Sequence, residues 1–122
     1  MIASVMMCAS VVLLLIGMLA GVVMGMHQDF TLAPAHAHLN LVGGVLLFLF
    51  GLYYRVVPAA GRLAMAKVQG SLHIAGAIVF PTGIALVTLK GHSYVAAPIV
   101  GSLIVVIATA LFVTIVFRTS RS

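Results

Sequence analysis

Four long apolar segments, separated by short polar connections, constrain this chain more than any other feature. They run over residues 2–26, 35–57, 66–89 and 94–117. A helix needs about 20 mainly apolar residues to cross a bilayer, and each segment is that long. We therefore predict an all-α integral membrane protein with four transmembrane helices. Because the connections are short, we expect consecutive helices to pack antiparallel in one four-helix bundle that forms a single domain, residues 1–122.

The scarcity of charged side chains points the same way. Six Lys or Arg and one Asp make up only 6% of the 122 residues, against roughly 25% in an ordinary soluble domain. So few charges cannot cover a water-exposed surface, and the lipid bilayer is the expected solvent. A disulfide scaffold is excluded because Cys8 is the only cysteine. The net charge of +5 lies at the ends of apolar segments, which favours membrane topology over a nucleic-acid partner.

The basic residues also predict how the chain is oriented. With four spans, both termini lie on the same side as the connection between the second and third helices. That side holds five of the six basic residues: Arg55, Arg62, Lys67, Arg118 and Arg121. Lys90 alone lies on the other side. The positive-inside rule then places the N and C termini in the cytoplasm, and we expect a bacterial inner membrane whose outer side faces the periplasm.

Five histidines are unusual in so apolar a chain, because ionisable groups inside a membrane are costly and mark functional sites. Four of them fall near the outer side: His27, His36, His38 and His92. His73 lies six residues beyond Lys67, which is ~9 Å from the inner boundary at the helical rise. His38 lies seventeen residues before Arg55, or ~25 Å from that boundary. This difference in depth argues against one metal ion shared by His73 and the outer histidines.

The pair His36 and His38 is the sharpest local signal. On a helix, residues two positions apart diverge by about 200°, so the two imidazoles would serve two neighbouring sites. If the segment is instead extended after Pro34, both imidazoles face one side and can chelate one ion. Pro34 suits the first turn of a helix, which favours the divergent arrangement.

Small residues recur at helical spacing and predict close packing. Gly17, Gly21 and Gly25 are spaced by four in the first segment, a pattern that lets another backbone approach. A smooth surface of this kind beneath a histidine also accommodates a flat macrocycle. In the third segment, Gly76 and residues 81–83 predict a kinked and tightly packed helix.

Residues 35–58 read AHAHLNLVGGVLLFLFGLYYRVVP. This segment resembles the tenth helix of the catalytic subunit of haem-copper oxidases, and it is most similar to the cbb-type branch and its nitric oxide reductase relatives. The chain as a whole resembles one four-helix arc of that subunit, helices nine to twelve. The resemblance implies that His36 ligates a high-spin haem and His38 a low-spin haem, most simply b-type. A looser likeness around His73 to the start of the next family helix adds this residue to the implied cofactor ligands.

The chain also departs from the family. The family's catalytic subunit has twelve or more helices in three arcs around a pseudo-threefold axis, whereas this chain has one arc. The histidines that hold copper in the family's sixth and seventh helices have no counterpart, and Tyr53 and Tyr54 lie at the inner end, far from the haem level. The resemblance therefore implies a homotrimer that rebuilds the threefold scaffold. His36 of one copy and His38 of the next are then expected to ligate haem iron from opposite sides.

Three functions follow from these observations. The first is a membrane haem protein that acts in electron transfer or in redox chemistry of O2 or NO, with a quinol or a cytochrome as electron donor. The second is a binding protein for copper or zinc, which imidazole suits; its ligands would be drawn from His27, Asp29, His36, His38 and His92. The third is a non-catalytic membrane subunit of a respiratory complex. Paired acid–base catalysis is excluded within one chain because it has a single carboxylate side chain, so any enzymatic activity is expected to be oxidoreductase-like.

Overall fold

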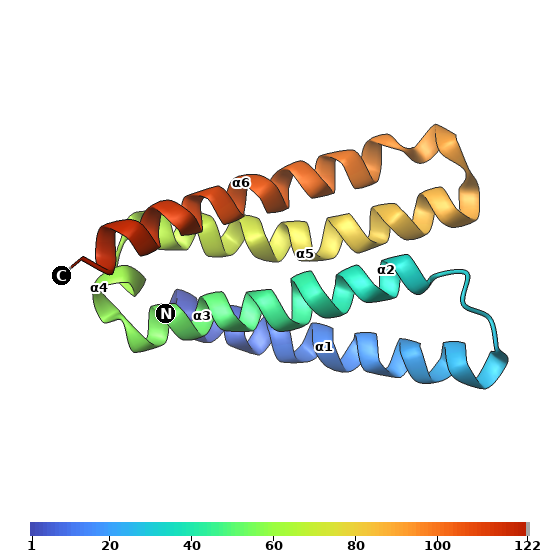
Figure 1. Ribbon diagram of the computed structural model, residues 1–122, viewed down its shortest axis with the longest axis horizontal. Helices are drawn as coiled ribbons and strands as arrows, with labels where there is room; N and C mark the ends of the chain where they lie inside the picture. The colour runs from blue at the N-terminus through green and yellow to red at the C-terminus, as the bar shows by residue number, and fades with distance from the viewer. Residues whose placement is uncertain (122) are drawn as a thin grey trace.

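The computed structural model describes residues 1–121, and within them it is built from helices and short turns without any strand. Four helical segments are long and apolar enough to cross a membrane: Ile2–His27, Ala33–Val56, Ala64–Lys90 and His92–Thr119. The predicted all-α protein with four candidate membrane spans is thereby confirmed. Figure 1 shows both chain ends at the same end of the molecule, which we call the termini end. The turns that follow the first and third spans lie at the opposite end, the hairpin end.

The second and fourth spans are assembled from more than one helical element. The elements, in chain order, are α1 (Ile2–His27), α2 (Ala33–His38), the π-helix η1 (Leu39–Leu46), α3 (Leu47–Val56), α4 (Pro58–Gly61), α5 (Ala64–Lys90), the 3-10 helix η2 (His92–Tyr94) and α6 (Ala96–Thr119). The ends of the four long helical runs lie within two residues of those predicted from hydropathy, a difference that capping turns ordinarily produce.

Local sequence explains where these helices begin and end. Pro34 lies in the first turn of α2 and Pro58 in the first turn of α4. Proline suits this turn because backbone N–H groups there have no hydrogen-bond acceptor within the helix. Gln28 closes α1 in the left-handed conformation, with φ of 49°. Gly91 closes α5 with φ of 102°, which a residue with a Cβ rarely adopts.

The π-helix η1 in the middle of the second span was not predicted. π-helical turns are wider than α-helical ones, are rare, and occur frequently at functional sites. Two buried glycines lie inside η1, and side chains of α1 pack where their Cβ atoms would be. A Cβ on Gly43 would lie 3.1 Å from Leu13 Cδ1, and one on Gly44 would lie 2.7 Å from Leu14 Cδ1. The wide turn is therefore accommodated where α1 can approach the second span closely.

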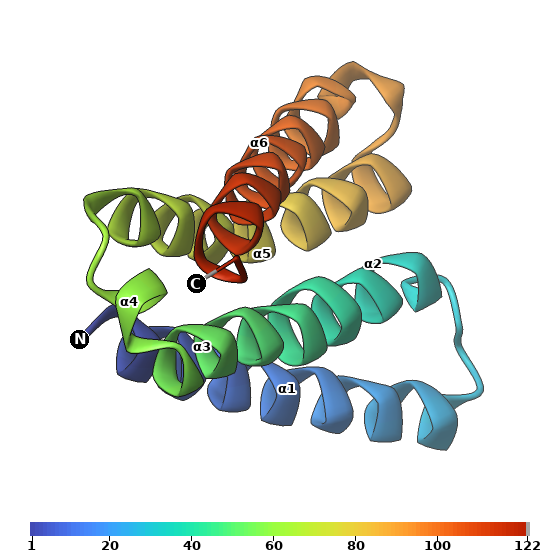
Figure 2. The same cartoon turned by 60° about the vertical axis from the view of Figure 1, so that its left-hand side comes forward.

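The four spans form two helical hairpins that pack on each other, as Figure 2 shows. One hairpin consists of α1 and the second span, the other of α5 and α6, and the second span lies against α5. The main hydrophobic core contains buried side chains from all four spans, among them Met6, Leu47, Phe50, Ala66 and Ile115. The ring of Phe50 also stacks on Phe112 of α6, with centroids 3.9 Å apart. This core holds the second span against α5. It therefore also orients α2, which carries His36 and His38 toward the hairpin end.

The helices α5 and α6 are in close backbone contact. A Cβ on Gly83 would lie 2.5 Å from the backbone nitrogen of Pro98, and one on Gly101 would lie 2.5 Å from the Cα of Phe80. The tight packing predicted for the third span is therefore present. Pro81 is buried within α5, and the helix continues past it to Lys90.

Candidate functional site

The helical backbone of α2 directs its two histidines to different neighbours. His36 faces α1, where a Cβ on Gly21 would lie 2.8 Å from its Cε1 atom. His38 faces α5, where its ring meets Phe80 edge to face with centroids 4.8 Å apart. The sequence left open a helical and an extended arrangement of this pair, and the chain adopts the helical one. The two imidazoles of one chain therefore do not converge on a common ion.

Two glycines of α1 make room for polar side chains of the second span. Gly17 and Gly21 are one helical turn apart, and they lie beneath Asn40 and His36, which are also four residues apart. A Cβ on Gly17 would lie only 1.8 Å from Asn40 Oδ1. Gly25, the third member of the predicted strip, has nothing within 4 Å of its Cβ position. The close approach expected from the glycine spacing thus occurs at two of the three positions.

Asn40 is a partner of His36 that the sequence analysis missed. Its Nδ2 atom lies 3.3 Å from His36 Nε2, so the amide donates to that nitrogen and Nε2 carries the lone pair. His36 Nδ1 and Asn40 Oδ1 are buried and have no hydrogen-bond partner among residues 1–121. An unpaired buried polar group costs about 1–3 kcal/mol. The four-residue spacing of His36 and Asn40 on a helix was the signal that could have found this pair.

His36 borders an apolar cavity of about 530 Å³ between α1, the second span and α5. The volume lies within the roughly 300–1,000 Å³ range of ligand and cofactor sites. The cavity is lined by Leu13, Ile16, Ala20, Val23, Met24, Leu32, Ala35, His36, Leu39, Ile78, Pro81, Thr82 and Ala85. His36 is the one ionisable side chain in this lining. A group bound there would therefore meet an imidazole in an otherwise apolar environment.

His38 is held by its own helix in a defined tautomer. Its Nδ1 lies 2.7 Å from the carbonyl oxygen of Pro34. A carbonyl only accepts, so Nδ1 carries the proton and Nε2 carries the lone pair. Histidines that ligate metals commonly donate their other ring N–H to a carbonyl or carboxylate in this way. His38 is partly buried, and its tautomer leaves Nε2 unprotonated.

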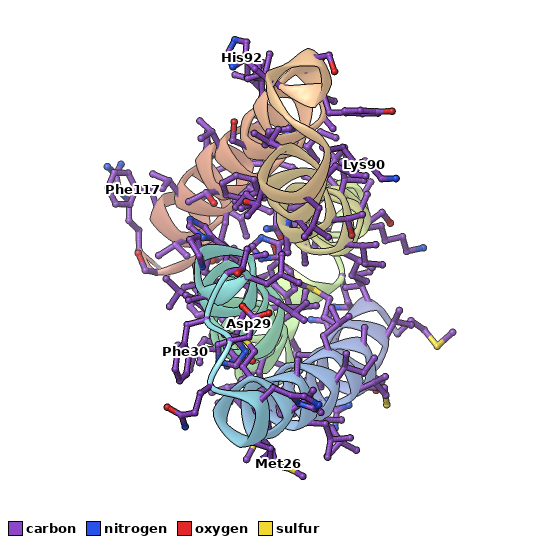
Figure 3. All side chains as sticks on the ribbon, turned by 90° about the vertical axis from the view of Figure 1, so that its right-hand side faces the viewer. Met26, Asp29, Phe30, Lys90, His92 and Phe117 are labelled. Carbon is purple, nitrogen blue, oxygen red and sulfur yellow. The ribbon has the colours of Figure 1, made fainter. Side chains whose placement is uncertain are left out.

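The remaining outer histidines are not brought to this site. His27 Nδ1 donates to the carbonyl of Val23 at 3.0 Å, and the side chain is exposed at the end of α1. His92 is exposed in η2, and Figure 3 shows it at the edge of the hairpin end, far from Asp29. No three His, Cys, Asp or Glu side chains among residues 1–121 are close enough to hold a metal ion. The bare-metal site considered from the sequence is thus not assembled within one chain.

Asp29 belongs to the turn between α1 and α2. Its Oδ1 accepts hydrogen bonds from the Thr31 hydroxyl at 2.5 Å and from the Thr31 backbone N–H at 3.1 Å. These two hydrogen bonds lower the pKa of Asp29 below its ordinary value of 3.8, and the bond from the hydroxyl has the larger effect. Asp29 and Thr31, together with His27, border another cavity of about 340 Å³ at the hairpin end.

His73 lies in the bundle core rather than at the His36 cavity. Its side chain is fully buried, its Nε2 is 2.9 Å from the carbonyl oxygen of Val42, and its ring meets Phe50 edge to face. The α5 residues that line the cavity begin at Ile78, about one and a half turns further along the helix. The structure therefore separates His73 from the cavity that His36 borders.

Comparisons of the chain with protein-family models, with curated proteins and with solved structures found no match.

Proposed function

We propose that this chain is a membrane haem-binding protein, with His36 and His38 as iron ligands, that acts in electron transfer or small-gas redox chemistry. The observation that carries the proposal is the imidazole of His36 in the wall of an apolar cavity of about 530 Å³. The cavity has the size of a cofactor site, an apolar lining and a histidine whose Nε2 is unprotonated. That lone pair accepts from Asn40 Nδ2 in this structure, so haem ligation would require iron to take the place of the amide donor. These properties fit a haem, and they agree with the resemblance of this segment to haem-ligating helices.

The roles of the chain's own residues follow from their contacts. Bound haem would supply one-electron redox chemistry, while the protein sets its ligands and surroundings. Without haem, Asn40 Nδ2 donates to His36 Nε2 and keeps this nitrogen unprotonated; on ligation this hydrogen bond would be given up. Gly21 leaves space beside the ring. The Pro34 carbonyl fixes the His38 ring with Nε2 free of its proton. The apolar side chains around His36 would limit the access of water to a bound haem and so would tune its redox potential.

The divergence of the two histidines supports an assembly of several copies. His36 faces α1 and His38 faces α5, so two histidines can ligate one iron only if they come from different chains. We propose a homotrimer, in which each interface is repeated three times and His36 of one copy is paired with His38 of the next. In this proposal the hairpin end faces the periplasm of a bacterial inner membrane, and a quinol or a cytochrome supplies electrons. Native mass spectrometry from nanodiscs is expected to give the mass of three chains.

Optical spectroscopy tests the proposal directly. We expect protein purified after haem b supplementation to show a Soret band, and its alpha band to sharpen on reduction with dithionite. His36→Ala and His38→Ala each remove an iron ligand and are expected to abolish or strongly shift these bands. His92→Ala is the matched control, because His92 is exposed in η2, and it is expected to leave the spectrum unchanged.

Two results would replace this function by another. Folded wild-type protein without a Soret band, but with stoichiometric copper or zinc that is lost in His36→Ala, would establish the metal-binding alternative. Protein that binds neither haem nor metal and co-purifies with a larger respiratory complex would establish a non-catalytic subunit.

A further inference from the structure

The core of the bundle contains a row of fully buried polar side chains that the proposed haem site does not use. Tyr54 of α3 is 2% exposed, and Gln69 and His73 of α5 are 0% exposed. They are surrounded by core side chains such as Met6 and Phe50. Polar groups in such a position need hydrogen-bond partners.

Part of this requirement is met by direct hydrogen bonds. The Tyr54 hydroxyl donates to Gln69 Oε1 at 2.7 Å. His73 Nε2 donates to the carbonyl oxygen of Val42 at 2.9 Å, so its other ring nitrogen, Nδ1, carries a lone pair. These bonds connect α3 to α5 and α5 to the π-helix η1.

Two atoms of the row have no hydrogen-bond partner among residues 1–121. Gln69 Nε2 has two N–H groups to donate, and His73 Nδ1 can only accept; both are buried. Gln69 and His73 are four residues apart on α5 and so lie on the same face, with Cβ atoms about 5–6 Å apart. Leaving both unpaired would cost about 1–3 kcal/mol each. A donor and an acceptor with this spacing suit one bridging molecule that accepts from the first and donates to the second.

We infer that a water molecule is bound between Gln69 and His73, accepting from Gln69 Nε2–H and donating to His73 Nδ1. A water molecule can both accept and donate, and buried waters ordinarily make about three hydrogen bonds to groups of this kind. The bridge completes a continuous polar row from Tyr54 through Gln69 and His73 to Val42.

The row of buried polar side chains ends at Tyr54, toward the termini end. Tyr54 borders a cavity of about 280 Å³ there, together with Met1, Arg55 and Arg62. The same tyrosine thus borders a surface cavity near two arginines on one side and contacts Gln69 on the other. The row extends polar contacts from that cavity into the core of the bundle, at the level of the π-helix. The inference does not depend on haem binding.

Water-edited solid-state NMR of the protein in bilayers tests this inference. We expect magnetisation from water to reach the His73 ring and the Gln69 side chain, and the ¹⁵N shift of His73 Nδ1 to be that of a hydrogen-bonded acceptor. In Gln69→Met, which keeps an unbranched side chain but removes the donor, the water signal at His73 is expected to disappear. Thr109→Val is the control, because the Thr109 hydroxyl donates to its own helix at Val105.

Two results would overturn the inference. One is a folded wild-type protein whose His73 ring receives magnetisation from lipid or neighbouring side chains but none from water. The other is a direct nitrogen–nitrogen coupling across a hydrogen bond between Gln69 Nε2 and His73 Nδ1. Both are measured on the wild-type chain, so the test holds even if Gln69→Met does not fold.

Discussion

The two glycines of α1 beneath the second span control how closely these helices approach. Gly17→Leu would place a side chain where Asn40 Oδ1 lies, 1.8 Å from the Cβ position. We expect this variant to be destabilised by about 1–3 kcal/mol relative to Gly25→Leu, because overpacking forces side chains and backbone apart. Gly25 has nothing within 4 Å of its Cβ position, and both substitutions raise helix propensity equally. Unfolding in mixed detergent micelles, followed by circular dichroism, measures the difference, and equal stabilities would contradict the packing described here.

Asp29 provides a pH prediction at the hairpin end. Its pKa is lowered chiefly by the hydrogen bond from the Thr31 hydroxyl and then by that from the Thr31 N–H. A lowered pKa means that the folded turn favours the carboxylate, so this contribution to stability is present above the ordinary pKa of 3.8 and is lost as pH falls through the folded value. Thr31→Val removes the first bond and is expected to raise the pKa of Asp29 toward 3.8.

The measurement is unusually direct because Asp29 is the one acidic side chain of the chain. A ¹³C NMR titration of its carboxyl carbon gives the pKa without overlap from other side chains. Thr88→Val is the control, since the Thr88 hydroxyl donates within its own helix to Ile84. An Asp29 pKa that is identical in Thr31→Val and the wild type would show that the turn does not hold the carboxylate.

Among the elements, the π-helix η1 makes the second span tolerant of a deletion. A π-helical turn accommodates one residue more than an α-helical turn. We expect deletion of Leu41, which is 54% exposed within η1, to convert the segment to α-helix. The flanking helices α2 and α3 would then keep the same faces toward their neighbours. Deletion of Leu103, 55% exposed in α6, is expected to turn the following residues by about 100° and remove Ala108 and Ile115 from their packing. Circular dichroism and size-exclusion chromatography should show a folded Leu41 deletion and an unfolded or aggregated Leu103 deletion; the reverse order would contradict this assignment.

For the whole molecule, the arrangement of the two ends predicts a labelling pattern. Ala59 lies at the termini end and Ser93 at the hairpin end, and both side chains are exposed. In a Cys8→Ser background, we expect a membrane-impermeant thiol reagent to label Ser93→Cys on intact cells and to label Ala59→Cys only after lysis. This result follows from the excess of basic residues at the termini end. Labelling of Ala59→Cys in intact cells would place the termini outside.

Much of the fold is predictable because its signals are local. Runs of about 20 apolar residues leave lipid as their solvent, and a helix satisfies every backbone group within one segment. Pro34 marks a helix start through its fixed φ and missing N–H, and Gly91 marks a helix end because glycine tolerates a positive φ. The divergence of His36 and His38 also follows from helix geometry once Pro34 indicates a helix. None of these signals requires knowledge of a neighbouring segment.

The missing parts are those in which distant residues meet. The π-helix follows no hydropathy period, and it occurs where Leu13 and Leu14 of α1 pack against the glycines of η1. The sequence identified His36 as a candidate ligand but did not reveal that the Asn40 side chain lies against Gly17, where a Cβ would be. A histidine spacing alone likewise does not predict that Gln69 and His73 are buried together with unpaired atoms.

The sequence by itself determined four membrane spans, their antiparallel order and the helical turn that separates His36 from His38, because these depend on hydropathy and local backbone geometry. Only the tertiary structure decided what each histidine contacts: α1 and a cavity for His36, Phe80 of α5 for His38, and the core for His73. The physical reason is that a helix's own sequence does not determine its rotation about its axis relative to its neighbours. That rotation is determined by packing, here by glycines of α1 and by the core shared with α5 and α6.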